Sequence, residues 1–128
     1  QVSLHVYVDL LIKMPREIIH VSVGQCGNQI GAVFWDHVLK EHNIKEDGFF
    51  NMHENLQYED FFKLDKIHVY FQEATEYTDK YVPRTIMLDL EPGVIDKVRN
   101  SNIGSLFHPD FILTRASGAG NNWAKGHY

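Results

Sequence analysis

The chain has 128 residues, enough for one domain, and its 44% hydrophobic content argues against disorder. Lys and Arg number 12 against 17 Asp and Glu, and the resulting net charge of −5 disfavours a general nucleic-acid binder, because such proteins carry a basic patch. The single cysteine, Cys26, excludes an intrachain disulfide and fits a reducing intracellular compartment, and no apolar run approaches the roughly 18–20 residues that a membrane span requires.

Residues 1–13 are apolar but are interrupted by Asp9. No positively charged region precedes this stretch and no small-residue cleavage site follows it, so a signal peptide is a poor fit. Its apolar residues do alternate, which leaves a genuine extra strand open as an alternative to an upstream extension of the domain.

Apolar residues at every second position predict a strand over residues 17–23, with Ile19, Val21 and Val23 on one face. The glycine-rich stretch 24–31 follows, and an amphipathic helix is expected from near Asn28 to about Lys40. A strand-to-helix turn of this kind offers free N–H groups that suit a phosphate. The glycine spacing fits neither the dinucleotide pattern nor Walker A. Tight packing of the helix on the sheet, with no ligand, explains the glycines equally well.

Residues 43–66 are polar and rich in turn formers, which predicts a long loop. Two Phe-Phe pairs, at 49–50 and 61–62, are expected to anchor it to the core, although contact with a neighbouring subunit is the alternative. Alternation predicts a short half-exposed strand over 67–72. A polar turn is expected over 73–80, after which the chain pairs back as a small hairpin.

The second half of the chain repeats the strand-then-helix order. Residues 85–90 form a nearly continuous apolar run, which predicts a strand buried on both faces of a parallel sheet. A short helix is expected from Pro92 to about Asn100, since proline suits the first helical turn. Residues 111–114 predict the next strand, and a second glycine turn over 117–122 leads into another helix.

This alternation predicts an α/β fold, a Rossmann-like parallel sheet with flanking helices. Three loops follow three of its strands, over residues 24–31, 89–93 and 117–122. Ligands of such sheets bind in a crevice at the carboxyl ends of the strands. We therefore expect the three loops to form one shared site.

The loops carry groups that suit a magnesium-bound phosphate. Backbone N–H groups and the side-chain amides of Gln25 and Asn121 can hold phosphate oxygens without adding a full positive charge. Carboxylates at Glu91 and Asp89 are useful beside a phosphate when Mg²⁺ bridges them, directly or through water. Each residue also has a simpler role: Asp89 and Glu91 could cap the following helix, Gln25 could hold a turn, and Asn121 could cap a helix.

Three motifs, in order along the chain, resemble the tubulin family. The first comprises Glu17-Ile18-Ile19-His20, Gly24-Gln25-Cys26-Gly27-Asn28-Gln29-Ile30-Gly31 and Phe34-Trp35. The second runs from Tyr81-Val82-Pro83-Arg84 through Asp89-Leu90-Glu91-Pro92-Gly93, and the third is Ser117-Gly118-Ala119-Gly120-Asn121-Asn122-Trp123-Ala124-Lys125-Gly126-His127-Tyr128. The closing motif is most similar to the β type, whereas the opening Met14-Pro15-Arg16-Glu17 is more like the γ type.

The resemblance implies that residues 14–128 are the N-terminal part of a tubulin-type GTP-binding domain. Met14 lies where such a domain would start, so residues 1–13 are expected to be an upstream extension. The implied ligands are GTP and Mg²⁺, with Glu91 near the metal and Asp89 as an additional contact through water. The remaining site residues implied by the resemblance are Gln25 at the phosphates, Cys26 and Gln29 near the nucleotide, and Ala119, Gly120 and Asn121 near the γ-phosphate. For Cys26, a helix N-terminus favours the thiolate, but a small residue fitting under the nucleotide is the role we expect.

The function implied is that of a GTP-binding subunit of cytoplasmic microtubules, paired with an α-tubulin-like subunit and without nucleic-acid or membrane partners. Hydrolysis would need a neighbouring subunit. The family's main phosphate loop, Gly-Gly-Gly-Thr-Gly-Ser-Gly, is absent from these residues, so we expect residues 1–128 alone to bind GTP weakly or not at all. The alternatives are a γ-like or divergent tubulin and a non-functional fragment or regulatory paralogue. A P-loop enzyme would carry Gly-Lys-Ser/Thr, which is absent.

Overall fold

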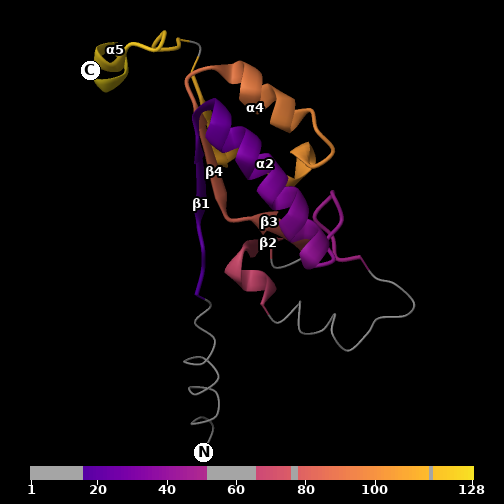
Figure 1. Cartoon of the computed structure of the whole chain (residues 1–128). Coiled ribbons are helices and arrows are strands. Elements are labelled where there is room, and N and C mark those ends of the chain that lie inside the picture. The colour runs from indigo at the N-terminus through magenta and orange to yellow at the C-terminus, as the bar shows by residue number, and fades with distance from the viewer. Residues whose placement is uncertain (1–15, 52–65, 76–77, 116) are drawn as a thin grey trace, which may run out of the picture.

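The computed structural model describes residues 16–51, 66–75, 78–115 and 117–128, and the predictions for residues 1–13 and for Phe61-Phe62 fall outside them. A parallel sheet in the order β1-β4-β5 forms the centre (Figure 1). Its strands are β1 (His20–Val23), β4 (Thr85–Asp89) and β5 (Ile112–Thr114). Helices α2 (Gly24–Glu41) and α4 (Pro92–Arg99) lie on the same side of this sheet. The predicted α/β fold with a parallel sheet and flanking helices is confirmed.

Helix α2 begins four residues earlier than the sequence predicts. It starts at Gly24, directly after β1, instead of near Asn28. Gly24 has φ +70° and Val23 before it is extended, so a single residue turns the chain from strand to helix. The glycine-rich stretch is therefore the first two turns of the helix, not a separate loop.

A two-stranded antiparallel hairpin lies between β1 and β4 in the sequence. It pairs β2 (Phe71–Thr75) with β3 (Thr78–Pro83), so most of the predicted polar turn over 73–80 is strand. The predicted strand over 67–72 is wrong in its first half, where the 3₁₀ helix η1 (Ile67–Val69) forms. Ile67 and Phe71, four residues apart, are both almost fully buried, a spacing that alternation and a helical turn satisfy alike, but Val69 between them is only half-buried.

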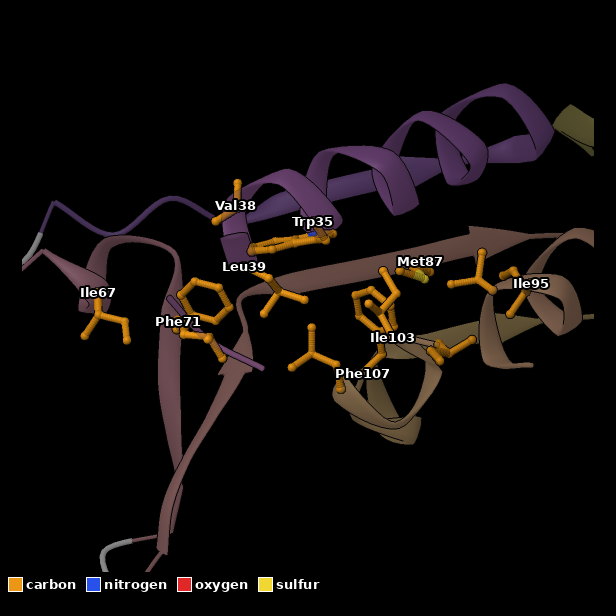
Figure 2. Close-up of a cluster of buried hydrophobic side chains, with 13 residues drawn as sticks. Trp35, Val38, Leu39, Ile67, Phe71, Met87, Ile95, Ile103 and Phe107 are labelled. Carbon is orange, nitrogen blue, oxygen red and sulfur yellow. The ribbon is translucent and has the colours of Figure 1, made fainter. Parts of the chain in front are cut away.

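The core lies between the two helices, the hairpin and the central sheet (Figure 2). The ring of Trp35 projects from α2 and meets Phe71 of the hairpin edge-on, with 5.6 Å between ring centroids. The other members of the core come from every element around it: Val38, Leu39, Ile44, Ile67, Met87, Ile95, Val98, Ile103, Leu106, Phe107 and Ile112. Phe49, in contrast, is 40% exposed and joins the hairpin through a backbone bridge to Lys80, so the expected side-chain anchor is not formed at that residue.

The two faces of β1 differ from each other. Ser22 is buried against α2 at Gly31. A Cβ at Gly31 would overlap the Ser22 Oγ, so this close packing of strand and helix requires glycine there. Ile19, Val21 and Val23 lie on the opposite face and are 51–66% exposed. In β4, Thr85 and Met87 are buried while Ile86 and Leu88 are only half-buried, so the prediction of burial on both faces is met on one.

Three further elements complete the described chain: η2 (Gly104–Leu106) and η3 (Pro109–Phe111) precede β5, and α5 (Trp123–His127) follows it. Figure 1 shows α5 beyond the carboxyl ends of the strands, away from α2 and α4. Among the described helices, none is both long and apolar enough to cross a bilayer.

Candidate functional site

The N-terminus of α2 is fixed to the end of β4 by one buried side chain. Asn28 is fully buried, and its Nδ2 donates to the carbonyl oxygens of Gly24 at 2.8 Å and Leu88 at 3.0 Å. These bonds join the turn that carries Gln25 to the loop that begins at Asp89. Asn28 was not expected to have this role, although its place in the buried stripe of α2, with Gly31, Trp35 and Val38, is a signal for it.

The loop after β4 carries two carboxylates with different environments. The Oδ1 atom of Asp89 accepts a hydrogen bond from the Glu91 N–H at 3.0 Å. The Oδ2 atom is buried and, within the described part of the chain, has no protein partner. Glu91 occupies the N-cap position of α4, but its side chain makes no capping hydrogen bond. The simpler capping role therefore does not account for the Glu91 carboxylate.

The third loop turns through two consecutive left-handed residues. Asn122 N–H donates to the Ala119 carbonyl at 3.1 Å, and the residues between them, Gly120 and Asn121, both have φ +58°. Positive φ at both central positions is the pattern of a type I′ turn. Asn122, not Asn121, caps α5, because its side chain accepts from the Lys125 N–H at 3.2 Å. The capping alternative for Asn121 is thus wrong.

The third loop passes directly over the carboxylate of Glu91. A Cβ built on Gly118 would lie 3.0 Å from Glu91 Oε1 and 3.3 Å from its Cγ. That separation is too small for a side chain to fit without displacing the carboxylate. Glycine at this position therefore lets the backbone of the third loop approach Glu91 closely.

The start of α2, the loop after β4 and the loop after β5 together enclose one open cleft of about 1060 Å³. Six of the eight residues predicted for the site line it: Gln25, Asp89, Glu91, Ala119, Gly120 and Asn121. The other two, Cys26 and Gln29, are exposed on the first turns of α2 and do not form part of its wall. Convergence of the strand-end loops, expected from the order of the strands alone, is what the structure displays.

The electrostatic character of the cleft comes from side chains and helix ends together. Asp89 and Glu91 place two carboxyl groups in its wall. Both α2 and α4 begin at this edge, so the positive ends of two helix dipoles lie here. Arg115 is the one cationic side chain among the described residues of the wall. An anion that carries a divalent cation would complement this combination of groups.

One known protein family matches the chain over the residues that form this cleft. Residues 17–128 match the Tubulin/FtsZ family, GTPase domain. The chain belongs to the tubulin family. The opening, central and closing motifs all fall within the matched residues.

Curated relatives of this tubulin-family chain include tubulin β chains. The tubulin beta-6 chain of Gallus gallus is 55% identical over 113 residues, which are 88% of this chain and 24% of that relative. The tubulin beta chain of Saccharomyces cerevisiae is 53% identical over 113 residues, 88% of this chain and 23% of that protein. The β-type similarity predicted from the closing motif is confirmed. The tubulin-family chain spans about a quarter of the length of these relatives.

Arg115 is a site residue that lies outside the three motifs of this tubulin-family chain. It lies between the predicted strand over 111–114 and the predicted turn over 117–122, so neither pattern includes it. Its position directly after the last residue of β5 was the available signal, because side chains at the ends of parallel strands face the crevice edge.

Proposed function

We propose that the protein is a GTP-binding tubulin subunit whose nucleotide site is the cleft at the strand ends. The observation that carries this proposal is the meeting of Gln25, Glu91 and Asn121 in one wall, from three segments far apart in the sequence. Membership of a family described as a GTPase domain supports guanosine triphosphate as the ligand. A phosphate needs many donors, and a helix N-terminus, a left-handed turn and two amides supply them.

Different residues of the cleft would bind different parts of the nucleotide. The first turn of α2 and the Gln25 amide would donate hydrogen bonds to phosphate oxygens. The turn over 119–121 would bind the terminal phosphate with its backbone N–H groups and the Asn121 amide. Cys26 and Gln29 would lie at the margin of the nucleotide, since both are exposed on the adjoining turns of α2.

Magnesium fits the carboxylates of this cleft. Mg²⁺ prefers oxygen ligands and usually takes one or two carboxylates together with substrate phosphates and waters. Asp89 offers a buried oxygen that no described residue satisfies, and Glu91 offers an exposed carboxylate. The described residues hold no group of three or more potential protein ligands, so the ion would depend on phosphate oxygens for the rest of its coordination. Bound there, Mg²⁺ would neutralise charge on the phosphates.

The wider role we propose is that of a structural subunit of cytoplasmic microtubules. The relatives at 50–55% identity are named as tubulin β chains, which supports pairing with an α-tubulin-like subunit. The nucleotide would lie at the longitudinal contact, where the neighbour completes hydrolysis. Co-sedimentation with assembling tubulin tests this: the protein should enter the polymer pellet, and a protein left wholly in the supernatant would contradict the role.

The nucleotide site itself is tested by titration of the protein expressed from its whole native coding sequence. GTP with Mg²⁺ should bind in preference to ATP. Each of Gln25→Ala, Glu91→Gln and Asn121→Ala should weaken GTP binding about tenfold or more, since hydrogen bonds to charged groups contribute roughly 1.5–3 kcal/mol. Glu91→Gln should also weaken the dependence of binding on Mg²⁺.

The matched control for Glu91→Gln is Glu41→Gln. Glu41 is an exposed carboxylate at the far end of α2 and does not line the cleft. Its affinity for GTP should equal that of the unaltered protein. Equal affinities for all the variants, or a preference for ATP, would contradict the proposed site.

A further inference from the structure

Arg115 is held at the cleft by its backbone. It follows β5 directly, and its N–H donates to the carbonyl oxygen of Asp89 at 3.3 Å. This bond continues the pairing of β5 with β4 by one residue beyond Thr114. The Cα of Arg115 is therefore fixed beside the carboxylate loop, and Arg115 is an exposed residue of the cleft wall.

The guanidinium group of Arg115 forms no ion pair with the acidic residues near it in the described part of the chain. In the described part of the chain, the arginine ion pairs join Arg84 to Glu17 and Arg99 to Asp96, and none involves Arg115. Asp89 and Glu91 lie in the same wall but within 4.0 Å of no guanidinium nitrogen of Arg115. Its five N–H donors thus remain available to a ligand in the cleft.

The charges of the cleft wall indicate which part of a nucleotide Arg115 would contact. Two carboxylates and one guanidinium leave the wall with a net negative charge, while a nucleoside triphosphate is a polyanion. Helix ends and amides supply only partial charges. Arg115 adds the full positive charge that the other phosphate-binding groups lack, and its planar fork matches two phosphate oxygens at once.

We propose that Arg115 is a phosphate-binding residue of the cleft that makes affinity rise with the number of phosphates on the nucleotide. This inference rests on the proposed nucleotide site and adds to it a residue outside the three motifs. Arg115 contributes little to holding the nucleoside, because its donors serve the charged end of the ligand.

The test is a titration of the protein from its whole native coding sequence with guanosine, GMP, GDP and GTP, in the presence of Mg²⁺ and at two salt concentrations. Arg115→Gln should weaken GTP binding about tenfold, the size expected for a charge-assisted hydrogen bond. It should leave guanosine binding unchanged and reduce the salt dependence of GTP binding. The GTP affinity of Arg115→Lys should lie between those of the unaltered protein and Arg115→Gln, because lysine keeps the positive charge but lacks the planar fork of donors.

The matched control is Arg99→Gln on α4, an exposed arginine that does not line the cleft. Its affinities should equal those of the unaltered protein. If the unaltered protein binds GTP and Arg115→Gln binds it equally well, the inference is overturned while the proposed function stands. Equal losses for guanosine and GTP would also overturn it, because they would mean that Arg115 acts only on the shape of the site. If the unaltered protein binds no GTP, the proposed function fails and the inference fails with it.

Discussion

Gly24 and Gly93 both lie in the first turn of a helix, and a comparison of the two separates the effect of backbone conformation from that of available space. An added Cβ would meet no heavy atom within 4 Å at either residue. Gly24 has φ +70°, whereas Gly93 is not in the left-handed region. Gly24→Ala should therefore lower the free energy of unfolding by about 1–2 kcal/mol, the cost of a left-handed non-glycine residue.

Gly93→Ala is the control for this prediction, and it should leave stability unchanged or raise it by up to about 1 kcal/mol, because alanine favours a helix. Denaturant unfolding of the two variants and the unaltered protein measures both changes. Equal destabilisation by the two substitutions would show that the conformation of Gly24 is not what requires glycine there.

His20 gives the interface between β1 and α2 a dependence on pH. Its ring stacks on Phe34 with 5.1 Å between centroids, and its Nδ1 lies 3.3 Å from Thr85 Oγ1 and 3.4 Å from Ser22 Oγ. Burial lowers the pKa of His20 below its usual 6.5. As pH falls below 6.5, the unfolded chain takes up this proton before the folded protein does, so stability is full above 6.5 and is lost as pH falls through the folded pKa.

His20→Gln should therefore flatten the fall in unfolding free energy between about pH 7.5 and about pH 5.5, measured by denaturant unfolding at a series of pH values. His37→Gln provides the comparison, because His37 is exposed on α2, and this variant should keep the slope of the unaltered protein. A slope for His20→Gln equal to that of the unaltered protein would mean that this histidine does not contribute.

At the scale of elements, Asn28 is the link between α2 and β4. Asn28→Ala removes the donor to the Leu88 carbonyl and leaves that oxygen without its partner. The expected loss is about 1–3 kcal/mol of unfolding free energy. Asn100→Ala, at the exposed C-cap of α4, should change stability by no more than about 0.5 kcal/mol. Thermal or denaturant unfolding of both compares the two asparagines, and similar small effects would refute the linking role.

The sequence predicts some elements well because local and long-range signals agree. The apolar run from Thr85 and the proline at position 92 each mark a boundary, and β4 and α4 begin at those residues. Where two patterns coexist, the sequence is ambiguous. Ile67 and Phe71 satisfy both alternation and a four-residue spacing, and core packing selects the helical turn. The start of α2 depends on one left-handed glycine, which periodicity does not report.

The candidate site was predictable in its outline and not in its connections. Strand order alone places Gln25, Glu91 and Asn121 at one edge, because loops after parallel strands share it. The bonds of Asn28 to two carbonyl groups depend on the angle at which α2 meets β4, and no motif encodes that angle. The place of Arg115 in the wall depends on how far β5 pairs with β4, and sequence patterns locate the end of a strand only to within about 2–4 residues.

At the scale of the whole molecule, the sheet has one covered face and one open face in the described residues. Helices α2 and α4 cover the first, and the second carries Val21, Val23 and Leu113, which are 51–64% exposed. The cleft lies at the edge between these faces, where three strands end. Its walls belong to different segments of the chain, so a ligand that binds all three would add a further link to the core, the pairing of β1, β4 and β5, and Asn28.

The central claim is that the ends of the three strands form one shared nucleotide site. Amide hydrogen exchange of the protein from its whole native coding sequence, with and without GTP and Mg²⁺, tests it most directly. We predict that GTP slows exchange in all three segments: the first turn of α2, residues 89–93 and residues 117–122. Exchange at the C-terminal end of α2, near Glu41, should be unchanged. Protection confined to one of these loops, or located away from all three, would contradict a shared nucleotide site at the strand ends.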